Sequence, residues 1–231
     1  MPPTPRERAR AQTMAEIVRI GRQHLVTDGA AALSLRAVAR ELGVVSSAVY
    51  RYVKSRDELL TLLVVDGYEE LGDAVDAAVA AVPADDLRGR QAAIGRAVRS
   101  WALAEPATYA LLFGSPVPGY EAPAERTNVP GTRVVRALLA VWQDAYAAGR
   151  LAPPAQEVTS PGLHAGFAAA RDELGLDLPD DVIVAGVFGW AALFGCLSFE
   201  VFGQYGRDGL GDPEALFEHH LALLADAVGL A

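Results

Sequence analysis

Short polar and basic side chains crowd one stretch of the sequence, residues 46–54. The serine hydroxyls there can donate and accept hydrogen bonds, and the stretch also carries two phenols and two cations. Side chains of this kind at the start of a short helix can reach base edges in the DNA major groove, while neighbouring cations hold phosphates. The candidate DNA-contacting residues of this stretch are Ser46, Ser47, Ala48, Tyr50, Arg51 and Lys54.

Two further arginines flank this stretch at the starts of expected helices. Arg36 follows Ser34, a plausible N-cap of the preceding helix, and Arg56 follows Ser55, which looks like the cap of the next helix. The amide groups at a helix start favour anions, so a cation at the same place helps to hold a phosphate. We therefore add Arg36 and Arg56 to the candidate DNA contacts.

The apolar residues predict two short helices that would position these side chains. In the first helix they recur at i, i+3, i+4 and i+7, at Leu35, Val38, Ala39 and Leu42. Gly43 suits the left-handed position after a helix and would make the turn. The residues expected to bury the second helix, about 46–53, against the first are Val44, Val49 and Tyr52. This is a helix-turn-helix pattern, although any two short helices joined by a glycine would show it.

The charge distribution favours DNA binding as the role of this helix pair. The whole chain has 231 residues and a net charge of −9, which is unusual for a nucleic-acid binder. Residues 1–60, however, hold ten basic and six acidic side chains, whereas residues 61–231 hold ten basic and 23 acidic ones. Such an asymmetry points to contact of the basic segment with a polyanion.

Three blocks of residues 10–62 resemble the N-terminal signature of TetR-type transcriptional regulators. They are Ser34–Val44 (SLRAVARELGV), Ala48–Val53 (AVYRYV) and Ser55–Leu60 (SRDELL). By this resemblance Tyr50, Lys54 and Arg56 would contact phosphates, and Ser46, Ser47 and Ala48 would face bases. Val45 stands where the family commonly has a capping serine, so Ser46 is the alternative cap. The resemblance implies a ligand-responsive regulator, in most cases a repressor, that binds a palindromic operator on double-stranded DNA.

Two later blocks resemble an effector-domain subclass with a Trp-x-x-Leu-His-Gly motif. They are Trp101–Pro106 with Tyr109 and Leu112–Gly114, and Trp190–Gly195, in which Phe194 replaces the histidine. By this resemblance the last two long helices, about 180–203 and 213–228, would form a four-helix bundle with a second subunit. An uncharged stretch of 18 residues, 182–199, agrees with a homodimer seam.

Helical periodicity runs through the whole sequence, and strand signals are nearly absent. We predict an all-α protein of about ten helices, with an N-terminal three-helix helix-turn-helix domain and a larger C-terminal helical bundle domain. The division is expected at residues 1–56, for DNA binding, and 57–231, for effector binding and dimerisation. Beyond the short helices, the expected ranges are about 7–27, 55–81, 86–104, 106–113, 128–148, 162–174, 180–203 and 213–228, with a loop at 114–126.

Stretch 182–199 is also at the lower length limit for a membrane span. Its flanks are acidic, whereas membrane anchors usually carry basic residues on one side, so we favour a helix buried at an interface. A membrane-anchored sensor stays open as the alternative. The first eight residues lack an apolar signal-peptide region, and Cys196 is the only cysteine. A cytoplasmic protein without membrane contact is expected.

An effector pocket would need apolar walls and a few polar groups. Aromatic residues of the C-terminal region, with one histidine and one arginine, are the candidates for a small, unidentified effector. They are Trp101, Phe113, Arg133, Trp142, His164, Phe167 and Trp190. Ordinary core packing is the alternative for each aromatic ring, and a surface or core position is the alternative for His164.

The hypothesis that the protein is an enzyme is the least favoured one. The sequence has no phosphate-binding glycine loop, no Gly-x-Ser-x-Gly and no His-Glu-x-x-His. His219 and His220 are adjacent and point about 100° apart on a helix, which does not suit a shared metal. We expect no catalytic residues, no metal site and no cofactor.

Overall fold

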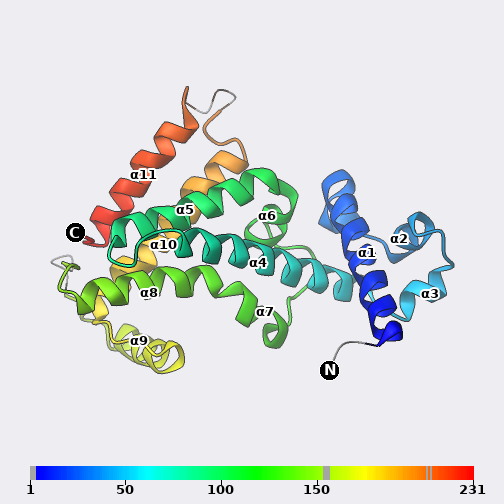
Figure 1. Ribbon diagram of the computed structural model, residues 1–231, viewed down its shortest axis with the longest axis horizontal. Helices are drawn as coiled ribbons and strands as arrows, with labels where there is room; N and C mark the ends of the chain where they lie inside the picture. Colours follow the sequence, from blue (N-terminus) through cyan, green and yellow to red (C-terminus); the bar gives the residue numbers. More distant parts are fainter. Residues whose placement is uncertain (1–3, 153–156, 207, 209) are drawn as a thin grey trace. The chain divides into compact units, whose positions relative to one another are not determined.

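The computed structural model describes residues 4–152, 157–206, 208 and 210–231. Within these residues the chain forms eleven α-helices, one short 3-10 helix (η1) and no strand, which confirms the all-α prediction (Figure 1). In chain order the elements are α1 Pro5–Asp28, η1 Ala30–Ala32, α2 Leu35–Glu41, α3 Ser46–Tyr50, α4 Arg56–Ala80, α5 Leu87–Ala104, α6 Pro106–Phe113, α7 Ala124–Gly131, α8 Arg133–Ala147, α9 Pro161–Leu174, α10 Asp180–Val201 and α11 Pro213–Ala227.

The expected helix at 128–148 is wrong in one respect, because two helices occupy this region. Helix α7 begins inside the expected loop, at Ala124, and ends at Gly131, and α8 begins at Arg133. Pro130 has no amide hydrogen to donate to the previous turn, and the following glycine is a weak helix former. The backbone therefore leaves the first helix at Gly131 and starts a second one after Thr132.

The helices pack into two compact units. One comprises the residues up to Glu70 together with Glu105–Gly131, and the other comprises Leu71–Ala104 and Thr132–Ala231. These packing units differ from the expected division after residue 56. Helices α6 and α7 group with the N-terminal helices, and α4 contributes its first fifteen residues to one unit and the remainder to the other. The functional division at residue 56 stays a prediction.

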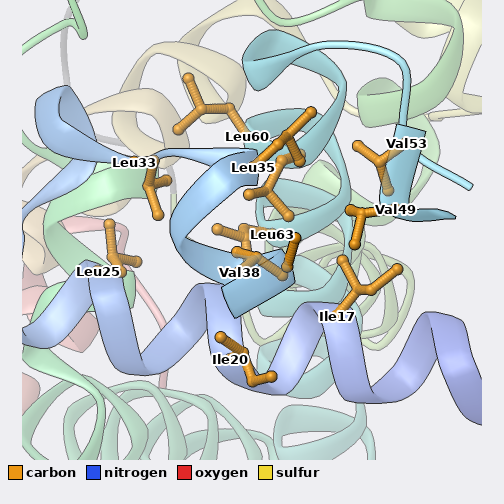
Figure 2. Close-up of a cluster of buried hydrophobic side chains, with 12 residues drawn as sticks. Ile17, Ile20, Leu25, Leu33, Leu35, Val38, Val49, Val53, Leu60 and Leu63 are labelled. Atoms are coloured by element: carbon orange, nitrogen blue, oxygen red, sulfur yellow. The ribbon is translucent and has the colours of Figure 1, made fainter. Parts of the chain in front are cut away.

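A dense apolar cluster holds the N-terminal helices in place (Figure 2). Ile17 and Ile20 of α1 meet Val38 of α2 and Val49 of α3, and all four are almost completely buried. The other members are Leu25, Leu33, Leu35, Ala39, Val53, Leu59, Leu60 and Leu63. The residues predicted to bury α2 and α3 belong to this cluster or pack against it, with the exception of Val44, which is 44% exposed at the turn.

In the second unit, α5, α8, α10 and α11 pack against one another through close approaches at glycines. Gly186 of α10 lies under the Trp142 ring, and Gly95 of α5 lies under the Leu221 side chain. A Cβ at either position would come within 2.5 Å of that neighbouring side chain. The Trp142 indole nitrogen donates a buried hydrogen bond of 2.8 Å to the Gln91 side-chain oxygen. The Gly186 contact brings α10 close to α8.

Candidate nucleic-acid interface

A tight turn sets the angle between α2 and α3. Gly43 has φ +69°, the left-handed conformation that favours glycine. Its N–H donates to the Arg40 carbonyl at 3.2 Å, and the Val44 N–H donates to the Ala39 carbonyl at 3.0 Å. These two bonds make a Schellman motif, which satisfies the last carbonyls of α2. The predicted role of Gly43 in the turn is confirmed.

Helix α3 has one buried side and one accessible side. Val49 is 1% exposed and belongs to the core cluster, whereas Tyr50 is 44% exposed. Ser47 and Arg51 are exposed as well, and Ser46 and Ala48 are partly exposed. Val45 occupies the N-cap position without a side-chain hydrogen bond, so Ser46 lies inside the helix rather than capping it. The accessible side of α3 therefore presents the polar set that the sequence predicted.

Arg36 and Lys54 lie at the ends of the elements next to α3. Arg36 is exposed in the first turn of α2, where Ser34 is the N-cap residue but makes no side-chain hydrogen bond. Lys54 is exposed just before α4, and its backbone N–H donates to the Glu58 carboxylate at 2.6 Å. Ser55 caps α4 by accepting from the Glu58 N–H at 3.1 Å. The cap holds the backbone and leaves the Lys54 ammonium accessible.

Arg56 is placed differently from the other candidates. One of its guanidinium nitrogens donates to the Ala30 carbonyl at 3.0 Å and to the Ala31 carbonyl at 3.3 Å. The other approaches the Asp57 carboxylate at 3.5 Å. The Arg56 side chain therefore ties the start of α4 to η1, and its phosphate contact stays a prediction.

Most basic side chains of residues 1–60 have no acidic partner among the described residues. Of the ten basic side chains in residues 1–60, three form ion pairs, namely Arg19, Arg22 and Arg56. The other seven are Arg6, Arg8, Arg10, Arg36, Arg40, Arg51 and Lys54. An unpaired, hydrated cation is free to exchange its counterions for a polyanion. This surface is therefore suited to binding phosphates.

Arg22 is a residue whose role the sequence reasoning missed. Its guanidinium lies 2.7 Å from the Asp66 carboxylate, 2.5 Å from that of Glu70 and 3.9 Å from that of Glu105. It thereby links α1 to α4 and to the start of α6. Since its partners lie 44 to 83 residues away, no local pattern marks this contact.

The candidate effector-pocket residues differ in their exposure and in their partners. Trp101 and Trp142 are buried, Phe113 and Phe167 are partly buried, and Trp190 is 40% exposed. The Arg133 guanidinium pairs with Asp73 and Asp76 of α4, and His164 pairs with Asp180. Hydrogen bonds from Arg171 and then His164 lower the pKa of Asp180. Phe113 belongs to the compact unit of the N-terminal helices, and the other six belong to the second unit.

Two hollows of the second unit bear on the pocket prediction. The smaller one, about 10 Å³, lies against Trp142 and Gln91. The larger one, about 260 Å³, is an open groove between α8 and the end of α9, lined by residues such as Arg136 and Leu176. It contains none of the predicted pocket residues. The Trp101 indole nitrogen is buried without a hydrogen-bond partner in the part of the chain described.

Helix α10 is long and apolar enough to cross a membrane by length and composition, with a mean hydropathy of 2.1 over its most apolar window. Only 39% of that window is buried within the chain. No group of three or more histidine, cysteine, aspartate or glutamate side chains suited to a metal ion occurs among the residues that the structure covers.

Two family models match the sequence. The model described as "Bacterial regulatory proteins, tetR family" matches residues 17–63. The model described as "Tetracyclin repressor-like, C-terminal domain" matches residues 91–224. The first covers α2, α3 and the exposed set around them, and the second covers most of the other helices.

Relatives and solved structures agree with these matches. The HTH-type transcriptional regulators Rv1816 of Mycobacterium tuberculosis and Mb1846 of Mycobacterium bovis are each 49% identical over 222 residues, covering 95% of this chain and 93% of theirs. The crystal structure of SCO4313 is 37% identical, with a TM-score of 0.74, and covers 96% of this chain and 100% of that one. A tetR-family protein from Rhodococcus RHA1 shares the fold at 17% identity, with a TM-score of 0.61 and coverage of 94% and 97%.

Proposed function

The chain belongs to the TetR family of helix-turn-helix transcriptional regulators, and from this premise we propose that it binds a palindromic operator as a homodimer and is released by a small-molecule effector. The chain is a regulator and not an enzyme. We further propose that it represses its target promoter and acts in the cytoplasm. The observation that supports the DNA contact is the accessible, polar side of α3. The cations around it that have no acidic partner among the described residues support it as well.

In this proposal α3 enters the major groove, where Ser46, Ser47 and Ala48 face bases. Their short side chains let the helix backbone approach closely, so base preference would depend on one or two hydroxyl contacts. The residues proposed to hold phosphates are Arg36, Tyr50, Arg51, Lys54 and Arg56. Two copies of α3 related by a two-fold axis would read two half-sites of the operator.

The proposed dimer seam is an exposed apolar stripe on α10. Phe188, Phe199 and Phe202 are 58%, 53% and 43% exposed, and they lie on one side of the helix. Ala191 and Gly195 stand between the rings on the same side, and a Cβ at Gly195 would meet no atom within 4 Å. Small residues between large rings let a second helix approach closely. On α11, Leu223 is 63% exposed and would extend the seam.

We place the effector in the second unit, where six of the seven predicted pocket residues lie. The finer resemblance of the Trp190–Gly195 block to the Trp-x-x-Leu-His-Gly subclass also belongs to this proposal. Trp101 supports it, since a buried indole N–H without a partner can donate to an acceptor group of a ligand. An effector must bind the DNA-bound and free conformations with different affinities to change DNA binding.

DNA binding is tested by selecting duplexes from a random pool with the pure protein and measuring affinity in a salt series. We expect a palindromic consensus and an affinity that falls steeply with salt, because bound phosphates release counterions. Replacing Ser47 with Ala should change the base preference while leaving the salt dependence intact. A protein that enriches no sequence, and whose weak binding is the same for S47A, would contradict the proposal.

The dimer is tested by sedimentation in buffer without detergent. We expect a soluble dimer, and Phe199→Glu should shift it to the monomer because a charge would be buried in the seam. Val26→Glu is the matched control, since Val26 is 69% exposed on α1 and lies outside the stripe. Solubility only in detergent would favour the membrane-anchored alternative, and a dimer unaffected by F199E would place the seam elsewhere.

The effector is tested by a compound screen with two readouts. A true effector should raise the melting temperature of the protein, because it binds the folded state, and should also release the selected operator. Trp101→Phe keeps most of the ring and removes the N–H, so it should weaken binding of a compound that accepts that hydrogen bond. A compound that stabilises the protein but leaves DNA binding unchanged is not the effector.

A further inference from the structure

Three arginines in the first turns of α1 are not among the candidate DNA contacts described above. Their side chains, those of Arg6, Arg8 and Arg10, are exposed and form no ion pair or hydrogen bond with other described residues. The nearby Glu7 carboxylate forms no ion pair with them among the described residues, and it accepts from the Thr4 N–H at 2.7 Å in the cap of α1. That hydrogen bond, with a second one from the Thr4 side chain, lowers the pKa of Glu7.

Two of these arginines share a helix face with core residues. Residues on an α-helix are about 100° apart, so Arg6, Arg10, Thr13 and Ile17 form one row. Ile17 lies in the core cluster against α2 and α3. Arg8 points roughly 160° away from Arg6, to the other side of the helix.

The contacts along this row show which surface of the protein it lies on. Thr13 lines a cleft of about 450 Å³ whose opposite wall includes Ala48, Arg51 and Tyr52, in and just after α3. One turn earlier, the Arg10 guanidinium carbon lies 5.3 Å from the centroid of the Tyr52 ring, a cation–π contact. Arg6 continues the row by one more turn, about 6 Å along the helix axis. The row therefore runs from the core, past the cleft, along the same surface as α3.

We propose that Arg6 and Arg10 extend the DNA interface of α3 to phosphates that flank the base pairs read by that helix. This inference rests on the proposed DNA-binding function. Arginine suits this role because its planar guanidinium can bind a phosphate with two parallel hydrogen bonds while it stacks on an aromatic ring. The Tyr52 ring orients Arg10, and Arg6 is the outer contact. Arg8 faces away and makes no such contact.

The test compares arginine variants on two lengths of the selected operator, one trimmed to the conserved core and one with native flanks. R6Q/R10Q is the test variant and R8Q the matched control, since it removes a cation from the same turns on the opposite face. On the flanked operator we expect R6Q/R10Q to weaken binding about tenfold and to lower the log–log salt slope by nearly two, about 0.9 per lost phosphate contact. R8Q should change both by little.

On the trimmed operator R6Q/R10Q should bind like the wild type. R10K is a second variant that keeps the charge and should retain the salt slope even if packing on Tyr52 changes. A change in salt slope for R8Q about half that for R6Q/R10Q, or equal losses on both operator lengths, would overturn the inference, because either result indicates a general effect of charge and no local contact.

The failure of this inference differs from the failure of the proposed function. If the wild type selects no DNA sequence, the proposed function is wrong. If the wild type binds its operator and R6Q/R10Q binds the flanked duplex equally well, only the role of Arg6 and Arg10 is wrong. Circular dichroism and the melting temperature of R6Q/R10Q show that the variant is folded in either case.

Discussion

Arginines in the two parts of the molecule have different surroundings. All four arginines of α5 pair with carboxylates, Arg88 with Asp226, Arg90 with Asp144, Arg96 with Glu218 and Arg99 with Glu200. In residues 1–60, by contrast, seven of ten cations have no acidic partner in the structure as described. The same side chain therefore stabilises helix packing in one part and stays available for a polyanion in the other. The net charge of the chain conceals this difference.

The largest effect is expected from Arg99→Ala, which breaks a paired arginine. Arg99 and Glu200 are 18% and 13% exposed and form two hydrogen bonds of 2.9 and 2.7 Å. Removal of Arg99 leaves a partly buried carboxylate without its partner and should lower the free energy of unfolding by about 2–3 kcal/mol. Chemical denaturation measures this. Arg136→Ala, the exposed control, should change stability by less than about 0.5 kcal/mol.

Arg56→Ala should lower folding stability by an intermediate amount. Arg56 belongs to both groups, because it forms hydrogen bonds within the protein and is also a candidate phosphate contact. Loss of its hydrogen bonds to the Ala30 and Ala31 carbonyls should cost about 1–2 kcal/mol of folding stability. A DNA phosphate contact would add a loss of affinity in operator titrations below the melting temperature. Unchanged stability would show that these carbonyl contacts do not matter to the fold.

Lys54→Ala tests the other side of the comparison. We expect folding stability within about 0.5 kcal/mol of the wild type, because the ammonium has no partner among the described residues to lose. Operator affinity should fall severalfold for all sequences, and the salt slope should decrease by about 0.9. Fluorescence anisotropy at several salt concentrations measures both. A destabilised K54A protein with an unchanged salt slope would reverse the assignment of this residue.

The smallest effect is expected from acidification of the Arg96–Glu218 pair. The hydrogen bonds from Arg96 hold the pKa of Glu218 below its ordinary value of 4.5. The pair therefore contributes stability above the ordinary value and loses it as the pH falls through the lowered pKa. Since both groups are exposed, the contribution is small. The difference in melting temperature between wild type and Glu218→Gln should shrink on acidification, and a difference that grows would contradict this sign.

Local patterns predicted most of the fold but not the contacts between distant segments. The positions of Gly43 and Ser55 mark helix ends correctly, because caps and turns depend on a few adjacent residues. The periodicity predicts one long helix over 128–148 that includes Pro130, whereas the missing N–H of Pro130 helps to end α7. The polar side of α3 followed from periodicity alone.

The sequence could not show which residues line an effector pocket, and the reason is a different one. Aromatic residue type does not reveal whether a ring lines a cavity or fills the core, and Trp142 fills the core with its N–H bonded to Gln91. Its residue type makes Arg133 a candidate polar group of the pocket, but its guanidinium pairs with Asp73 and Asp76 on another helix. Such pairings depend on tertiary packing, and the sequence spacing of the two partners carries no sign of them.

In the proposed homodimer, the apolar stripe of α10 would link the stability of this protein to its abundance. Phe188, Phe199 and Phe202 are exposed in a single chain and would be covered in the proposed homodimer. Covering them adds stability only when another copy is present, so the melting temperature should rise with protein concentration. A regulator of this kind would be least stable when it is scarce. Newly made chains would then be most vulnerable to degradation before they find a partner, which sets a lower limit on useful expression.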